Sequence, residues 1–226
     1  MELINKGKTK DVYELENGNY LLVFKDDVTG TNGVFDPGAN TVGLTMEGAG
    51  QAGLRLTKFF FETFKKWQIP THYVSANLEE NTMEVLKAKP FGSGLECICR
   101  FKAVGSFLKR YGKYCEEGQN LDALVEITIK DDEAGDPLIT EDALVMLGIT
   151  TSEEYSELVR LTREISEGIA KILREEEMEL YDIKLEFGKD AEGKIMLIDE
   201  ISGGNMRVYR GDEKIMPLDL PGLLIG

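Results

Sequence analysis

LYDIKLEFG (180–188) is joined by a short glycine-bearing turn to KIMLIDEIS (194–202) near the end of the chain. Both segments have the apolar content of strands, and their spacing predicts an antiparallel hairpin. Because successive side chains of a strand point to opposite faces, Asp182, Lys184 and Glu186 share one face of the first strand.

The second strand of this hairpin ends in two acids, Asp199 and Glu200. Acids gathered beside Lys184 on one sheet face fit a magnesium–phosphate site, because Mg²⁺ prefers carboxylate and phosphate oxygens. The alternative is an exposed face of alternating salt bridges. The run 195–198 is apolar on both faces, which indicates a central strand and argues against that alternative, but the residues alone leave both interpretations open.

Three further segments carry groups that suit anions. GKTK (7–10) opens a predicted hairpin and could lay backbone N–H groups and an ammonium over a polyphosphate, or be only an exposed turn. Arg100 precedes a Gly-Ser pair at which Ser106 begins a predicted helix, which is either an anion-binding geometry or an ordinary helix cap. Arg207 follows the acidic strand and is expected to reach the same cavity. Together these segments predict a site that binds a nucleoside triphosphate and a second anionic substrate.

The rest of the chain predicts an α+β fold of mostly antiparallel strands and a few helices, with a smaller lobe to about residue 90 and a larger lobe after it. The segment 29–53 has seven glycines and is predicted to be a long loop without regular structure. The acidic loop 130–137 by itself predicts only a turn. The predicted strands are 12–15, 20–25, 71–76, 83–90, 95–104 and 122–129, and the predicted helices are 54–69, 106–112, 140–147 and 152–177. Asn17-Gly18 predicts a hairpin turn between the first two strands. Thr150 or Thr151, with Glu153 or Glu154 three residues on, predicts a capping box at the start of the last helix, whose apolar residues recur at spacings of three and four.

The composition excludes several classes of partner. The chain has 26 basic and 41 acidic residues and a net charge of −15, whereas nucleic-acid backbones and anionic membranes require a basic face. Three cysteines suit a reducing cytoplasm, and no apolar run approaches the roughly 20 residues that span a bilayer. A single histidine, His72, argues against a structural zinc site and against Ser-His or Cys-His catalysis.

Taken in order, these motifs resemble the SAICAR synthetase (phosphoribosylaminoimidazole-succinocarboxamide synthase) family. The most specific part is D-x-K-L-E-F-G at 182–188 followed by D-E-I-S at 199–202. The resemblance runs through nearly the whole chain and also includes GKTKDVY (7–13), FKDD (24–27), IPTH (69–72), AVGSFLKRYG (103–112), KDDEAGDP (130–137) and Arg207.

The resemblance implies a two-lobed α+β fold with an ATP cleft between a β-rich nucleotide-binding lobe (1–90) and a C-terminal lobe (91–226) that holds the substrate and metal site. It implies a ligase of purine biosynthesis. ATP would phosphorylate the carboxylate of carboxyaminoimidazole ribonucleotide, and the amine of L-aspartate would attack the acyl phosphate to form an amide. ATP and Mg²⁺ are the implied cofactors and the cytoplasm is the implied location, while a homo-oligomer stays open.

By position, the resemblance gives the ATP contacts to Lys8, Lys10, Lys25, Glu186 and Asp199. The last two acids would also hold the metal and would act in catalysis beside Lys184. The substrate contacts fall to Arg100, Ser106, Asp182, Ser202 and Arg207. The sequence singles out no residue as the general base.

The sequence departs from the family pattern at 49–55, at 101–104, at Thr140 and at 203–204, where the usual Pro-Asp is absent. These positions lie where the acidic substrate or the amine would be recognised. The alternative is therefore an amide ligase of the same fold with a different carboxylate or amine. A nucleotide sensor without catalysis is a third hypothesis, against which the retained pair Glu186 and Asp199 argues.

Overall fold

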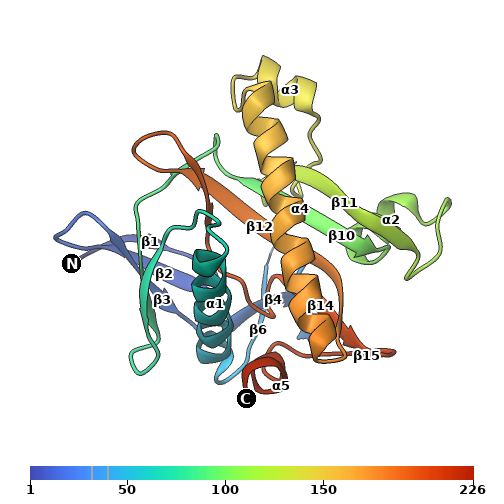
Figure 1. Ribbon diagram of the computed structural model, residues 1–226, viewed down its shortest axis with the longest axis horizontal. Coiled ribbons are helices and arrows are strands. Elements are labelled where there is room, and N and C mark those ends of the chain that lie inside the picture. Colours follow the sequence, from blue (N-terminus) through green and yellow to red (C-terminus); the bar gives the residue numbers. More distant parts are fainter. Residues whose placement is uncertain (32, 40) are drawn as a thin grey trace.

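The computed structural model describes residues 1–31, 33–39 and 41–226. Over these residues the chain forms three antiparallel sheets, of five, seven and three strands, with helices packed beside them (Figure 1). The predicted α+β class is confirmed. The division into lobes at residue 90 stays a prediction.

The five-stranded sheet comes from the N-terminal part of the chain and has the order β1-β2-β3-β8-β7. Its tight turn at Asn17-Gly18, where Gly18 has φ 84, confirms the predicted hairpin. The strand β1 was not predicted, because all five of its residues are exposed and no apolar alternation marks it. The strands are β1 (Glu2–Lys6), β2 (Lys10–Glu14), β3 (Tyr20–Phe24), β7 (Tyr73–Asn77) and β8 (Thr82–Val85).

The seven-stranded sheet has the order β11-β10-β12-β14-β15, and β9 and β13 both pair with the far part of β12. The pairing of β12 with β13 confirms the predicted C-terminal hairpin. Across the sheet, Glu96 lies opposite Glu186 and Arg100 lies opposite Asp182. The strands are β9 (Lys89–Pro90), β10 (Leu95–Lys102), β11 (Asn120–Ile129), β12 (Glu179–Lys189), β13 (Ile195–Ile198), β14 (Met206–Arg210) and β15 (Glu213–Lys214).

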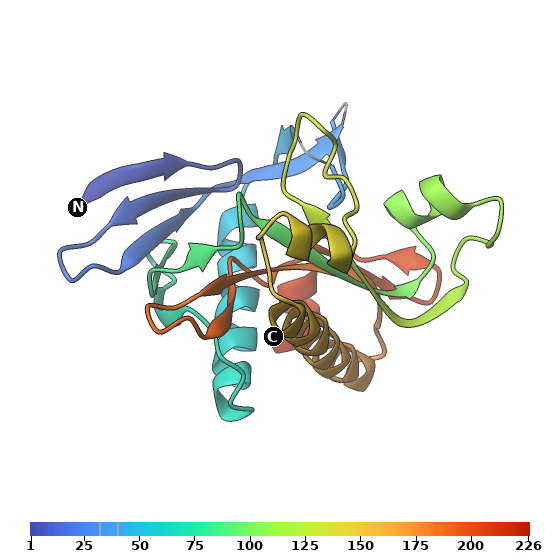
Figure 2. The ribbon, with the colours of Figure 1, turned by 90° about the horizontal axis from the view of Figure 1, so that it is seen from above.

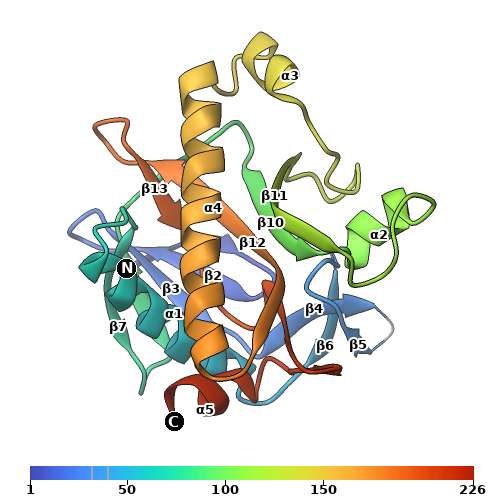
Figure 3. The same ribbon diagram turned by 45° about the vertical axis from the view of Figure 1, so that its right-hand side comes forward.

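The long helix α4 (Ser152–Glu175) crosses one face of this second sheet and packs against β10, β11 and β12 (Figure 3). Thr151 and Glu154 form the predicted capping box at its start. Its buried stripe includes Leu158, Ile165 and Leu173, as the spacing predicts. The other helices are α1 (Ala49–Lys66), α2 (Gly105–Tyr111), α3 (Glu141–Met146) and α5 (Leu220–Ile225).

The prediction of an irregular loop over 29–53 is wrong. Parts of the segment belong to a small sheet of β4 (Asp27–Thr31), β5 (Val34–Phe35) and β6 (Val42–Thr45), and its last residues belong to α1, which begins at Ala49. Two of its glycines enable the pairing: a Cβ on Gly43 would lie 2.5 Å from the Cα of Gly30. The glycines therefore permit close strand contact here. Residues 32 and 40 of the segment lie outside the described residues.

The prediction of one strand over 83–90 is also wrong. β8 belongs to the first sheet, whereas β9 pairs with β12 of the second, so this segment passes from one sheet to the other (Figure 2). The two sheets are also joined through β13, where the Leu197 N–H donates to the carbonyl of Pro70 and its own carbonyl accepts from His72. Within the residues described, no helix is both long and apolar enough to cross a bilayer.

Candidate active site

A cavity of about 410 Å³ opens where the first sheet, the small sheet and the β12–β13 end of the second sheet meet. Its walls come from the β1–β2 turn, β3, β4, the start of α1, the 130–136 loop and the turn after β13. The site residues that the sequence predicts and that line this cavity are Lys8, Lys10, Lys25, Lys184, Glu186, Asp199 and Ser202.

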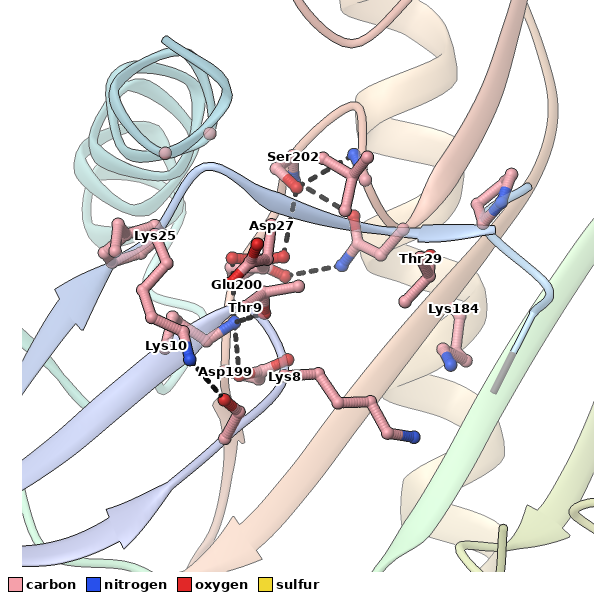
Figure 4. A pocket seen from close by; sticks show the side chains of 18 of the residues that line it. Lys8, Thr9, Lys10, Lys25, Asp27, Thr29, Lys184, Asp199, Glu200 and Ser202 are labelled. Atoms are coloured by element: carbon pink, nitrogen blue, oxygen red, sulfur yellow. Dashed lines mark hydrogen bonds and ion pairs between the residues drawn. The ribbon is translucent and has the colours of Figure 1, made fainter. Parts of the chain in front are cut away.

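The GKTK turn places Lys10 against the acids at the end of β13. A Cβ on Gly7 would lie 2.5 Å from the carbonyl oxygen of Lys10, so only glycine allows this turn. The Lys10 Nζ lies 2.9 Å from Asp199 Oδ1 and 2.8 Å from Glu200 Oε2 (Figure 4). Burial disfavours the ammonium, but the two carboxylates outweigh burial and raise the pKa of Lys10 above its ordinary value. Lys10 is thus a fixed positive charge in the cavity wall.

Two other lysines flank the same turn. The Lys25 Nζ donates to the carbonyl of Gly7 at 2.7 Å and lies 3.3 Å from Asp11 Oδ1. The Lys8 Nζ reaches across the cavity mouth to Asp132 Oδ1 at 2.6 Å, and both of these side chains are exposed. An exposed pair of this kind contributes little to stability, so Lys8 can exchange its partner for an anionic ligand.

Glu186 and Asp199 face the cavity from β12 and from the end of β13. Burial raises the pKa of Glu186, and the charge of Asp199 raises it further. Burial acts on Asp199 in the same direction, but Lys10 and Lys130 outweigh it and hold the pKa of Asp199 below its ordinary value. The Lys130 Nζ lies 2.6 Å from Glu186 Oε1. Two carboxylates that repel each other inside a cavity form a donor set that favours an added cation.

The donor set fits Mg²⁺ held together with a nucleotide. Over the described residues, no group of three or more His, Cys, Asp or Glu side chains is placed to hold a metal alone. Mg²⁺ is commonly bound by one or two carboxylates plus substrate phosphates and waters. Glu186 and Asp199 meet that requirement, whereas a site built only from protein ligands does not arise here.

Asp182 and Arg207 do not line this cavity, although the sequence placed both at the acidic site. The Arg207 Nη1 lies 2.7 Å from Asp182 Oδ2, and its Nη2 lies 2.8 Å from Asp36 Oδ1. Strand alternation correctly places Asp182 on the same face of β12 as Glu186. Because β12 is long, however, Glu186 lines the cavity while Asp182 lies outside it, beside Arg207. Lys184, between them, instead pairs with Glu96 at 2.7 Å.

Arg100, Ser106, Asp182 and Arg207 come together in what we call the arginine cluster, which also includes Glu126 and Asp36. Arg100 is 1% exposed. Its Nε lies 2.6 Å from Glu126 Oε2, its Nη1 lies 2.9 Å from Asp182 Oδ2, and its Nη2 donates to Ser106 Oγ at 2.9 Å. Arg100, Ser106 and Arg207, which the sequence assigns to one substrate, thus lie in one cluster, and their role and ligand stay predictions.

Gly105 lets Arg207 reach this cluster. It has φ +56, and a Cβ there would lie 2.7 Å from Arg207 Nη2. Positions 101–104, which precede it and differ from the family pattern, leave the Gly105-Ser106 pair unchanged. Thr140 caps α3 by accepting from the Ala143 N–H, so that departure has a structural use. Gly203 packs closely against Pro217, because a Cβ added to Gly203 would lie 2.6 Å from the Cα of Pro217.

Ser202 is separate from the arginine cluster. Its Oγ donates to Glu200 Oε1 at 3.2 Å and accepts from the Gly204 N–H at 3.0 Å, so it shapes the turn that closes the cavity. The sequence interpretation missed Glu96, Lys130, Glu126 and Asp36. A lone acid inside the apolar strand 95–102 was the available signal for Glu96, and Lys130 opens the acidic loop.

Comparisons with known proteins agree with this geometry. The family model described as SAICAR synthetase matches residues 3–217. The phosphoribosylaminoimidazole-succinocarboxamide synthase of Clostridium tetani is 64% identical over 226 residues, all of both chains. That of Methanocaldococcus jannaschii is 33% identical over 204 residues, which is 90% of this chain and 79% of the other.

Solved structures give the same result. A SAICAR synthetase in complex with ADP has a TM-score of 0.82 at 29% identity, covering 93% of this chain and 85% of that one. SAICAR synthetase from Pyrococcus horikoshii has a TM-score of 0.78 at 28% identity, with coverages of 91% and 85%. The predicted family and fold are confirmed: the chain belongs to the SAICAR synthetase family.

Proposed function

We propose that this chain is an ATP-dependent ligase of purine biosynthesis that joins L-aspartate to the carboxylate of carboxyaminoimidazole ribonucleotide. The observation that carries the proposal is the cavity in which the buried Lys10 faces Asp199 and Lys130 faces Glu186, beside a cluster that holds Arg100 and Arg207. The first set suits MgATP, and the second suits a phosphorylated substrate. Family membership and the ADP complex of a relative support this assignment.

In the proposed reaction, the substrate carboxylate attacks the γ-phosphoryl group of ATP, which breaks the bond to ADP and forms an acyl phosphate. The amine of L-aspartate then attacks the acyl carbon, phosphate leaves, and the nitrogen loses a proton. Such chemistry depends on positioning and on compensation of charge more than on a nucleophilic side chain.

The chain's residues take the following roles in this proposal. Lys8, Lys10 and Lys25 contact the phosphates of ATP. Glu186 and Asp199 would hold Mg²⁺, which would supply positive charge beside the transferred phosphoryl group. Lys184, held by Glu96, lies beside them. Arg100, Ser106 and Arg207 bind the phosphate of the ribonucleotide, Asp182 orients both guanidinium groups, and Ser202 shapes the wall of the substrate pocket.

The test measures ADP release with ATP, Mg²⁺ and carboxyaminoimidazole ribonucleotide, with and without L-aspartate. We expect aspartate-dependent ADP release and one equivalent of a succinocarboxamide product. If no ADP is released with aspartate but ADP is released with another amine, the alternative ligase is favoured. ATP binding without any ADP release would favour a sensor. With ¹⁸O in the substrate carboxylate, the acyl phosphate predicts one ¹⁸O atom in the released phosphate; unlabelled phosphate would contradict that intermediate.

The location and the assembly state stay predictions. Cys97, Cys99 and Cys115 are free thiols. Sedimentation of the purified chain would decide whether it forms a homo-oligomer.

A further inference from the structure

His72, the single histidine of the sequence, lies directly behind the cavity without lining it. It is buried, and its backbone is fixed on both sides. Its N–H donates to the carbonyl of Leu197 at 3.0 Å, and its own carbonyl accepts from the Leu86 N–H at 2.7 Å. Its ring stands edge-on to Phe61 with the ring centres 5.7 Å apart. The imidazole therefore has little freedom to move.

The ring is aimed at the backbone of a proposed metal ligand. His72 Nε2 lies 3.1 Å from the carbonyl oxygen of Asp199. A carbonyl oxygen can only accept a hydrogen bond, so Nε2 carries the hydrogen and donates it. Burial lowers the pKa of His72 to about 4, outweighing the attraction of Asp199 for a proton, so the ring is neutral near pH 7.

Asp199 is a residue whose conformation needs support. It follows the last residue of β13 with φ 67, in the left-handed region that residues other than glycine seldom adopt. Such a conformation persists only when its surroundings hold it. Two partners do so: Lys10 holds the carboxylate at 2.9 Å, and His72 holds the carbonyl.

We propose that His72 is a positioning residue of the ligase reaction: its Nε2–H fixes the left-handed turn at Asp199 and so directs the Asp199 carboxylate toward the metal of MgATP. The inference rests on the proposed role of Asp199 as a magnesium ligand. Residues that orient a metal ligand through a hydrogen bond typically change metal affinity by about 10–100-fold when they are replaced. His72 needs no contact with substrate to have such an effect.

Three substitutions of His72 separate the hydrogen bond from packing. His72→Phe keeps an aromatic ring beside Phe61 but has no donor. His72→Gln places an amide N–H at nearly the reach of Nε2, whereas His72→Asn places the same amide one carbon short. Phe61→Leu is the matched control, because it loosens the ring packing and leaves the donor in place.

The measurement is Mn²⁺ binding to the purified full-length protein in the presence of ADP, followed by electron paramagnetic resonance, with the midpoint of thermal unfolding recorded for each variant. We expect the Kd for Mn²⁺ to rise about tenfold or more in His72→Phe and His72→Asn, and to stay within about threefold in His72→Gln. Phe61→Leu should lower the unfolding midpoint without changing the Kd. In turnover assays, the KM for MgATP should follow the Kd, while the KM for the ribonucleotide stays constant.

Equal Mn²⁺ affinity in His72→Gln and His72→Asn would overturn the proposal, as would losses that merely follow the unfolding midpoints. If His72→Phe does not fold, the Gln and Asn pair still decides the question. Mn²⁺ binding with ADP needs neither aspartate nor ribonucleotide, so the inference about His72 can fail while the proposed reaction stands, and the reverse. A wild-type protein that binds no Mn²⁺ would overturn the metal role of Asp199 and the inference together.

Discussion

The cavity and the arginine cluster lie at two ends of the same strand, β12, yet they hold charge in different ways. In the cavity, each lysine acts as a point charge: Lys130 and Lys184 each meet one carboxylate, and Lys10 meets two. In the cluster, Arg100 and Arg207 share Asp182 and use several N–H groups each in fixed directions. An ammonium can give up its partner to a metal or a phosphate with little rearrangement, whereas a guanidinium fork is preorganised for one geometry.

The two regions differ in how readily a bound ligand can replace their ion-pair partners. Lys8 and Asp132 are exposed, and ligand phosphates can replace their contact. Arg100 is nearly inaccessible, so its partners Glu126 and Asp182 set its position before any substrate arrives. We therefore expect substitutions in the cavity to act mainly on metal and ATP, and substitutions in the arginine cluster to act mainly on the phosphorylated substrate.

The largest expected effect is that of Asp199→Asn. The amide keeps the size of the side chain but loses one of the two charges that hold Lys10 and a charge that would hold the proposed metal, so we expect kcat to fall by about 10²–10³-fold at saturating ATP. The affinity for the ribonucleotide should stay unchanged. Steady-state kinetics over a range of Mg²⁺ concentrations checks this, with Asp212→Asn in an exposed turn as the control. Unchanged kcat would remove Asp199 from the site.

Arg207→Ala should act on the other side of the comparison. It removes a charged group from Asp182 and from the proposed phosphate, and we expect ribonucleotide binding to weaken by about 1–3 kcal/mol while ATP binding is preserved. Ser106→Ala should change the same affinity in the same direction but by less, because Arg100 retains two carboxylate partners. Calorimetric titration of each ligand decides this. Equal losses for both ligands would contradict the separation of the two regions.

His72, which packs behind the cavity, should make the stability of the protein depend on pH. Its pKa is lowered to about 4 in the folded protein from an ordinary value of 6.5, so between these pH values the unfolded state binds a proton that the folded state does not bind. The stability contribution of neutral His72 is therefore complete above pH 6.5 and is lost as the pH falls toward 4, by about 1.4 kcal/mol per pH unit.

His72→Gln should remove this part of the slope. Urea unfolding of both proteins between pH 4 and 7 measures it, and the control is built into the sequence, which has no second histidine. Parallel curves for the two proteins would show that His72 is already charged or exposed in the folded state.

The smallest expected effect is that of Gly105→Ala. Its Cβ would meet the Arg207 guanidinium at 2.7 Å, and that guanidinium is held by Asp182 and Asp36. We expect ribonucleotide affinity to fall about threefold to tenfold, beyond a loss of stability of about 1 kcal/mol from the left-handed backbone. Gly118→Ala is the matched control, since Gly118 has φ +76 with nothing within 4 Å. Equal behaviour of the two variants would mean that Arg207 moves aside freely.

Much of this molecule is determined locally by its sequence. The hairpin at Asn17-Gly18, the capping box of α4 and the pairing of β12 with β13 follow from turn residues, caps and alternation, all of which act over a few residues. Glu186 and Asp199 were likewise predictable as a pair from the alternation and the end of the C-terminal hairpin, whereas their grouping with Lys10 came from the resemblance to the family.

Which of these residues meet depends on how the sheets pack in three dimensions. Packing places Asp182 and Glu186 in different sites and forms a small sheet from parts of the glycine-rich segment 29–53. It also brings Lys130, Glu96 and His72 into contact with residues far away in the chain. These contacts depend on the register between distant strands and on close backbone approach, as at Gly30 and Gly43. Neither leaves a periodic signal in the sequence, because both arise only when the sheets pack together.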